Sequence, residues 1–101
     1  MISAEITIIP IGTGKTSLSD YVAAAVAALD KNGVPYKVSG MGTIIESNDL
    51  EEVLDAVKVA HEAVFFKGTD RVATSIIIDD RRDVEKSIKE KVSSVREKLE
   101  K

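Results

Sequence analysis

Apolar and polar residues alternate along two stretches of the chain. In residues 2–11, the even positions from Ile2 to Ile8 are apolar, and residues 71–79 alternate in the same way from Val72 to Ile78. A period of two residues is typical of a strand with one face toward a core. These stretches therefore predict two strands, each with one apolar face.

Three other stretches carry apolar residues three or four positions apart, the spacing of an amphipathic helix. The first runs from an expected N-cap at Ser17, with Asp20 as its capping-box partner, to Asn32-Gly33, an expected left-handed C-cap. The second opens at Asn48 and ends at Gly68. The third begins near Asp83. We expect the third helix to bury this apolar edge: Val84, Ile88, Val92, Val95 and Leu99.

A Gly-rich hairpin is predicted between the first two helices. Residues 34–39 and 43–47 have extended character, and Gly40-Met41-Gly42 forms the turn between them. The order strand, helix, strand, strand, helix, strand is that of the ferredoxin-like fold. We therefore expect one α+β domain over residues 1–101, with an antiparallel four-stranded sheet, two helices on one sheet face and an extra C-terminal helix.

The composition excludes several classes of protein. The chain has 101 residues, a net charge of −3 and no cysteine. Scattered basic residues in an acidic chain argue against nucleic acid as a partner, and thiolate metal sites and disulfides are impossible. No signal peptide and no run of about 20 apolar residues is present, so we expect no membrane partner and a cytoplasmic location. A domain this small is marginal alone, which favours a homo-oligomer.

Residues 12–17, reading GTGKTS, resemble part of a phosphate-binding P-loop. They follow a strand and precede a helix, and Asp79 and Asp80 end a later apolar strand. The full motif requires a glycine five positions before Gly14, where this chain has Ile9. The fold that carries the motif also needs a parallel sheet. We therefore interpret residues 12–17 as a flexible loop.

The chain resembles the family of small thiamine-binding proteins over essentially its full length. The resemblance rests on the order and spacing of short pieces: Pro10-Ile11-Gly12, Ser19-Asp20-Tyr21-Val22, Tyr36, Met41-Gly42-Thr43, Glu46, His61, Gly68, Arg71-Val72 and Ile78-Asp79-Asp80-Arg81. Ser47 departs from the glycine expected after Glu46. The resemblance implies a ferredoxin-like homodimer or homotetramer. It also implies non-catalytic binding of thiamine or its pyrimidine moiety, with a pocket near the oligomer interface.

Several side chains are chemically compatible with such a ligand. Glu46 is suited to accept a hydrogen bond from the exocyclic amine of the pyrimidine, and a tyrosine ring is suited to a cationic thiazolium. The candidate ligand-binding residues are Tyr21, Tyr36, Met41, Thr43, Glu46, Arg71 and Ser75. Each has an alternative structural role, as a solvated carboxylate, a core tyrosine or an interface ion pair. Strand parity decides whether Thr43 or Glu46 faces the pocket, because a shift of one residue exchanges them.

Two other classes of function stay open. The chain fits a structural or regulatory homo-oligomer whose uncovered sheet face binds a partner. It fits less well a small hydrolase of the acylphosphatase type, because the loop after the first strand has Lys15 but no arginine. His61 has no second histidine or cysteine to form a zinc or nucleophile site, so we expect a packed or interface histidine. The sequence thus predicts no catalytic residue, metal or cofactor.

Overall fold

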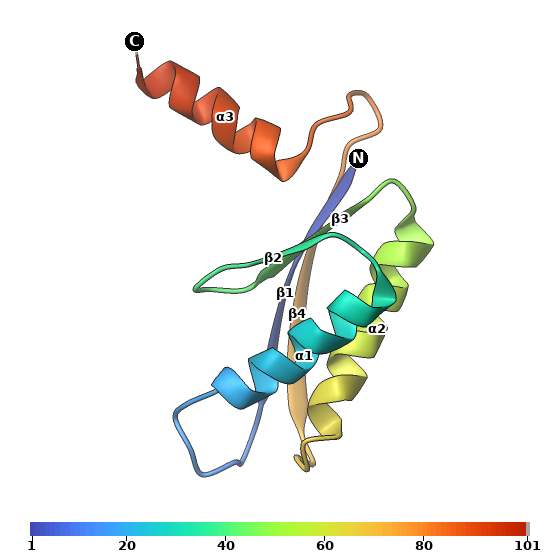
Figure 1. Ribbon diagram of the computed structural model, residues 1–101, viewed down its shortest axis with the longest axis vertical. Coiled ribbons are helices and arrows are strands. Elements are labelled where there is room, and N and C mark those ends of the chain that lie inside the picture. Colours follow the sequence, from blue (N-terminus) through green and yellow to red (C-terminus); the bar gives the residue numbers. More distant parts are fainter. Residues whose placement is uncertain (101) are drawn as a thin grey trace.

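The computed structural model describes residues 1–100 and contains four strands and three helices. The strands are β1 (Ile2–Pro10), β2 (Tyr36–Val38), β3 (Thr43–Ser47) and β4 (Val72–Asp80). The helices are α1 (Ser19–Asn32), α2 (Leu50–Phe65) and α3 (Ile88–Leu99) (Figure 1). This order confirms the predicted ferredoxin-like arrangement with an extra C-terminal helix.

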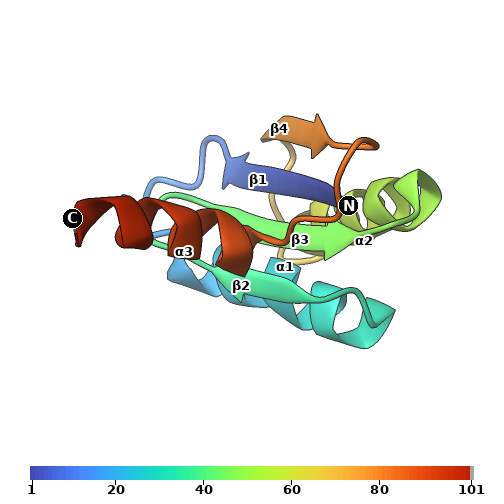
Figure 2. The same ribbon diagram turned by 90° about the horizontal axis from the view of Figure 1, so that it is seen from above.

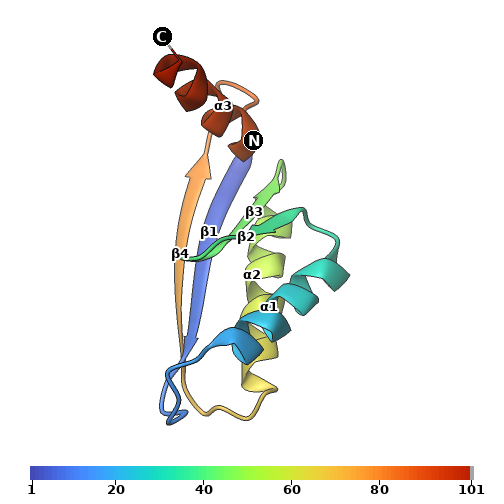
Figure 3. The ribbon, with the colours of Figure 1, turned by 60° about the vertical axis from the view of Figure 1, so that its left-hand side comes forward.

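The four strands form one antiparallel sheet in the order β2-β3-β1-β4. Figure 3 shows α1 and α2 together on one face of this sheet, while α3 lies at the end where β4 finishes. Because every strand pair is antiparallel, the sheet cannot be that of a P-loop nucleotide hydrolase. The interpretation of residues 12–17 as a loop is confirmed.

The core lies between the sheet and the two inner helices. The even residues of β1 face it, as predicted, and in β3 the core residue Ile45 is fully buried opposite Ala4. Leu29 of α1 and Val53 of α2 are also fully buried. Alanines also form part of the buried face of both helices: Ala25 of α1, and Ala56 and Ala60 of α2.

The start of α1 differs from the prediction. The helix begins at Ser19, and its N-cap position is Leu18, which makes no side-chain capping bond. Leu18 is half-buried and lines a small cavity together with Ile6 of β1, so an apolar side chain stands at the N-cap position. The predicted capping box of Ser17 and Asp20 is therefore wrong.

The other ends of the inner helices follow the expected chemistry more closely. Gly33 ends α1 with φ 79°, the left-handed conformation predicted for it. α2 is capped by Asp49, whose carboxylate accepts a hydrogen bond from the Glu51 amide at 2.9 Å. The cap is thus one residue later than the Asn48 expected from the sequence.

α3 is shorter and more exposed than predicted. It begins at Ile88 after a Ser87 cap, and the segment between β4 and the helix contains two hydrogen-bonded pairs, Arg81 with Asp83 and Arg82 with Asp80. No residue of α3 is buried, so the predicted buried edge is wrong. The C-terminal end of the helix projects away from the sheet, with Leu99 79% exposed (Figure 2).

The sheet face opposite α1 and α2 is covered only in part, by the first turns of α3. Residues on this open face alternate with the core residues along each strand, as the register requires: Ser3, Glu5, Thr7 and Ile9 of β1, Lys37 of β2, Ile44 and Glu46 of β3, and Ala73, Ser75, Ile77 and Asp79 of β4. Lys91 of α3 is tied to Asp79 by an ion pair of 2.5 Å. This face, where the strands meet α3, holds the candidate site.

Candidate ligand-binding site

A cavity of about 480 Å³ lies between the hairpin and α3. Its sheet wall is formed by β2 and β3, and its other wall by the first three turns of α3. Ile44, Ile88 and Val92 supply apolar surface, and Glu46 supplies a carboxylate. Small-molecule sites fall in the range of about 300–1,000 Å³ and combine apolar walls with a few polar groups. The cavity has the size and lining of such a site.

Glu46 connects the sheet to α3. Its Oε1 atom accepts a hydrogen bond from the Ile88 backbone amide at 2.8 Å, at the first residue of the helix. A carboxylate is stabilised there because the first amides of a helix have no partner within it. Among residues 1–100, the Oε2 atom accepts no hydrogen bond, so one oxygen stays available next to the cavity.

Ser3 is the cross-strand neighbour of Glu46 on the open face. β1 and β3 pair these two residues directly, and Ser3 is only 5% exposed. Its hydroxyl has no hydrogen-bond partner among residues 1–100. Buried hydroxyls nearly always have a hydrogen-bond partner, so the unpaired Ser3 hydroxyl requires an explanation. Ser3 faces a smaller cavity of about 160 Å³ beneath α3, whose walls include Ile44 and Ile88 of the larger one.

Three cationic side chains line the larger cavity. Lys37 comes from β2, and Lys89 and Arg96 come from α3. None of the three is in an ion pair with a carboxylate of residues 1–100, whereas Arg81, Arg82 and Lys91 are. The cavity therefore combines one carboxylate with three unneutralised cations.

The structure does not gather the seven predicted residues around one cavity: Tyr36 and Glu46 line this one, and Met41 and Thr43 line another, among α1, β1 and the hairpin. The Tyr36 side chain faces the helices, because Tyr36 pairs with the core residue Ile45 and packs against the core, and its hydroxyl donates to the Asp30 carboxylate at 3.2 Å. This hydrogen bond raises the pKa of the Tyr36 phenol above its usual value, because it stabilises the protonated form. Thr43 is 8% exposed and faces the helices, so Thr43 and Glu46 lie on opposite faces of the sheet.

The other predicted residues lie elsewhere. Tyr21 packs against the core from α1, and Met41 is 85% exposed at the tip of the hairpin. Arg71 and Ser75 are on the β4 side of the open face, across β1 from the hairpin. Because one chain does not gather these side chains around one cavity, their ligand-binding roles stay predictions.

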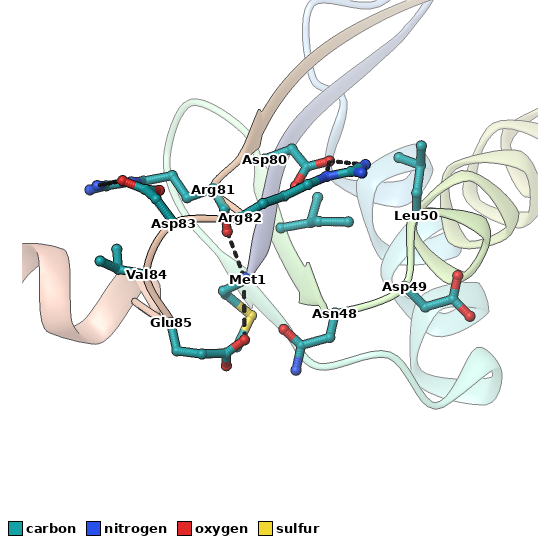
Figure 4. Close-up of a pocket in the computed structure, with 11 residues that line it drawn as sticks. Met1, Asn48, Asp49, Leu50, Asp80, Arg81, Arg82, Asp83, Val84 and Glu85 are labelled. Carbon is teal, nitrogen blue, oxygen red and sulfur yellow. Dashed lines mark hydrogen bonds and ion pairs between the residues drawn. The ribbon is translucent and has the colours of Figure 1, made fainter.

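Other cavities differ from this one in their lining. The cavity around the chain start has a volume of about 540 Å³, and Figure 4 shows its Arg81 and Arg82 bound to Asp83 and Asp80. Arg81 holds the pKa of Asp83 down to about 2 through their hydrogen bond. The third cavity, of about 240 Å³, lies among α1, β1 and the hairpin and is lined almost wholly by apolar side chains. A fourth cavity, of about 360 Å³ between α1 and α2, also combines a carboxylate, Glu62, with two cations, Lys31 and Lys58. The cavity between the hairpin and α3 differs from it because Glu46 lies beside the buried, unpaired hydroxyl of Ser3.

His61 lies outside these cavities. Its Nδ1 atom is 2.6 Å from the Thr74 hydroxyl, and its ring packs edge-on against Phe65 with centroids 5.3 Å apart. It is thus the packed, hydrogen-bonded histidine that the sequence predicted. Within residues 1–100, no cluster of three His, Asp or Glu side chains has a geometry that could hold a metal ion. In the same part of the chain, no helix is long and apolar enough to cross a membrane.

The fold and the cavity define a ferredoxin-like α+β domain with a site of small-molecule size. Residues 4–96 match the model of the family described as thiamine-binding protein. A UPF0045 protein of Methanothermobacter thermautotrophicus is 59% identical over 98% of this chain and 100% of its own length. The chain belongs to the thiamine-binding protein family, which confirms the resemblance noted from the sequence.

Solved structures agree with this assignment. A hypothetical protein of Methanocaldococcus jannaschii superimposes with a TM-score of 0.84 at 40% identity, over 95% of this chain and 96% of that one. A putative thiamine biosynthesis/salvage protein of Thermotoga maritima has a TM-score of 0.75 at 26% identity, over 94% of this chain and 98% of that one. Both likenesses extend over nearly the whole fold.

Sequence reasoning missed several residues of the cavity. The alternation in β1 places Ser3 on the face opposite the apolar one, but its burial depends on where α3 lies. Lys89 and Arg96 were missed because the third helix was read only for its apolar edge. Their spacing of seven residues, two helical turns, places them on one side of the helix and was a signal that could have been used.

Proposed function

We propose that this protein binds a thiamine-like heterocycle without chemical turnover, in the cavity between the hairpin and α3 and the smaller cavity at Ser3, which share Ile44 and Ile88 and together form the cavity beneath α3. The observation that carries the proposal is the pairing of Glu46 with Ser3 across β1 and β3. One offers a free carboxylate oxygen and the other a buried hydroxyl without a partner among residues 1–100. The proposal is supported by membership of the thiamine-binding protein family.

The aminopyrimidine ring of thiamine matches this pair. Its exocyclic amine donates hydrogen bonds and its adjacent ring nitrogen accepts one. Cross-strand neighbours have Cβ atoms about 5 Å apart, so a carboxylate and a hydroxyl from them can contact adjacent atoms of one ring. A ligand bound there would satisfy the Ser3 hydroxyl, which is costly to leave unpaired. Ile44, Ile88 and Val92 would contact the ring faces.

The residues around the cavity favour binding over catalysis. A nucleophile requires a base within hydrogen-bond reach, and the lone histidine, His61, is bonded to Thr74 on the helix-covered side of the sheet. Ser3 and Ser93 have no hydrogen-bonded base among residues 1–100, and the Tyr36 hydroxyl, which is bonded to Asp30, lies on the helix-covered side. We therefore assign the site to carriage, storage or sensing of its ligand.

Self-association through β4 is the second part of the proposal. β4 is an edge strand, and it alternates between residues bonded to β1 and residues facing outward. Ile11 donates to the Arg71 carbonyl at 2.8 Å and Arg81 to the Met1 carbonyl at 3.2 Å, so the odd positions of β4 pair with β1. The N–H and C=O groups of the even positions from Val72 to Asp80 therefore face the free edge.

This edge has the features of a strand that pairs with a second copy. It is nine residues long, contains no Lys or Pro, and carries the exposed side chains of Ile76, Ile77 and Ile78. Such an edge is a template for another strand unless something covers it. In an antiparallel pairing of two copies about Ser75, Arg71 of one copy lies opposite Asp79 of the other. Their opposite charges favour this register over one that sets Arg71 opposite Arg81.

Isothermal titration calorimetry with thiamine tests the ligand-binding proposal. We expect one saturable site per chain, and at least a tenfold loss of affinity in Glu46→Gln. The glutamine keeps an oxygen that accepts from the Ile88 amide but has no negative charge, so α3 stays in place. Glu62→Gln, on the exposed side of α2, is the matched control and should bind as the native chain does. If the native chain bound neither thiamine nor its phosphate esters, the proposal would be overturned, and the structural or regulatory homo-oligomer would take its place.

A further inference from the structure

We infer that the cavity beneath α3 binds a phosphate ester of the heterocycle in preference to the free alcohol. This inference rests on the proposed function, because it assigns the Glu46 and Ser3 end of the site to the pyrimidine. The new element is the set of three cations that line the same cavity, Lys37, Lys89 and Arg96. Nothing in the binding of an aminopyrimidine requires these cations.

The three cations come from two separate elements and converge on one cavity. Lys89 and Arg96 are seven residues apart in α3, which is about 10 Å along the helix axis. Ser93 lies between them and lines the same cavity, so a hydroxyl donor accompanies the two cations. Lys37 faces them from β2, on the open side of the sheet. An anion among these side chains would receive donors from both walls.

None of the three forms an ion pair with a carboxylate of residues 1–100. The chain as a whole has a net charge of −3, yet the cavity between the hairpin and α3 is lined by three cations and one carboxylate. The smaller cavity at Ser3 adds Glu5 and the ion pair of Asp79 with Lys91. In the cavity at the chain start, by contrast, each arginine binds an aspartate (Figure 4). Unpaired cations lining a cavity are suited to a phosphate, which forms charge-assisted hydrogen bonds to Lys and Arg.

Free thiamine is poorly matched to these three cations. Its thiazolium ring carries a permanent positive charge and would lie close to the three like charges. A phosphate or diphosphate on its hydroxyethyl arm reverses the sign of that end and turns repulsion into attraction. The charge pattern therefore separates the phosphorylated forms from the free alcohol, and screening by salt should weaken the distinction.

Competitive calorimetry tests this inference with four probes: thiamine, thiamine phosphate, thiamine diphosphate and inorganic pyrophosphate. We expect both esters to bind at least tenfold more tightly than thiamine in 50 mM salt, and the ratio to shrink in 500 mM salt. The double variant Lys37→Gln/Arg96→Gln should reduce ester binding to the level of thiamine and leave thiamine binding unchanged or slightly tighter. Lys58→Gln, on the exposed side of α2, is the matched control.

The possible outcomes separate this inference from the proposed function. Equal affinity for thiamine and its esters would overturn the phosphate preference and leave the heterocycle site intact. Pyrophosphate binding as tightly as thiamine diphosphate would also overturn it, because the inference requires both ends of the ligand. Binding of none of the four probes would overturn the proposed function itself.

Discussion

At the scale of single residues, the cations in the turn before α3 have carboxylate partners, and two cations within α3 do not. In the turn before the helix, Arg81 forms two hydrogen bonds to Asp83, at 3.0 and 2.6 Å, and Arg82 binds Asp80. The cations beyond the turn, Lys89 and Arg96, have no such partner among residues 1–100. Sequence alone could not separate these groups, because both sets of residues lie within four positions of a carboxylate.

The pairing of Arg81 with Asp83 predicts a low pKa for the aspartate. Carbon-detected NMR titration should show the Asp83 carboxyl titrating at about 2, below the usual value near 3.9. Because the folded pKa is lower than the unfolded one, this group stabilises the fold above pH 4 and loses that contribution as the pH falls toward 2. In Arg81→Gln, the pKa should return toward its usual value. An Asp83 pKa unchanged by Arg81→Gln would contradict the assigned cause.

At the scale of elements, strand patterning was the more reliable guide and helix boundaries were the less reliable. The alternating faces of β1 and β4 were predicted correctly, because a period of two assigns each side chain to a face once the strand is recognised. Helix starts depend on which of several capping residues is used. Asn48 and Asp49 are adjacent candidates, and only the packing of α2 selects Asp49. Ser17 has good capping chemistry but lies outside α1.

The corrected caps predict a difference between two substitutions. Asp49→Ala should lower the free energy of unfolding by about 1 kcal/mol, because the Glu51 amide loses its acceptor. Ser17→Ala should change it by less than about 0.5 kcal/mol, since Ser17 caps nothing. Urea unfolding followed by circular dichroism measures both values at one protein concentration. Equal losses for the two variants would restore the capping box predicted from the sequence.

At the scale of the whole molecule, the domain leaves much apolar surface uncovered. Ile77 on the open face is 66% exposed, and Val95 on α3 is 58% exposed. The sequence predicted the uncovered face from the strand and helix order, but not how little of it α3 covers. That could not be read from α3 itself, because an apolar stripe indicates a buried edge without saying which surface buries it. A second copy paired at β4 would cover Ile76 and Ile78.

The β4 edge gives a prediction for the oligomeric state. Size-exclusion chromatography with light scattering should show at least a dimer for the native chain and a monomer for Ile76→Lys, because a lysine on the free edge opposes strand pairing. Val95→Lys places the same charge on exposed α3 and should leave the assembly unchanged. The charge reversal Arg71→Asp should weaken the dimer, and adding Asp79→Arg should restore it. A native chain that is monomeric at all concentrations would contradict the self-association proposal.

The most direct test of the account is the location of the ligand. In ¹H–¹⁵N NMR spectra recorded during a thiamine phosphate titration, the amides of Ser3, Glu46 and Ile88 should shift most, because these residues surround the cavity beneath α3. The amides of Met41 and Thr43, which line the cavity among α1, β1 and the hairpin, should shift little. The reverse pattern, with shifts centred on Met41 and Thr43, would place the ligand on the other side of the sheet and contradict the assigned site.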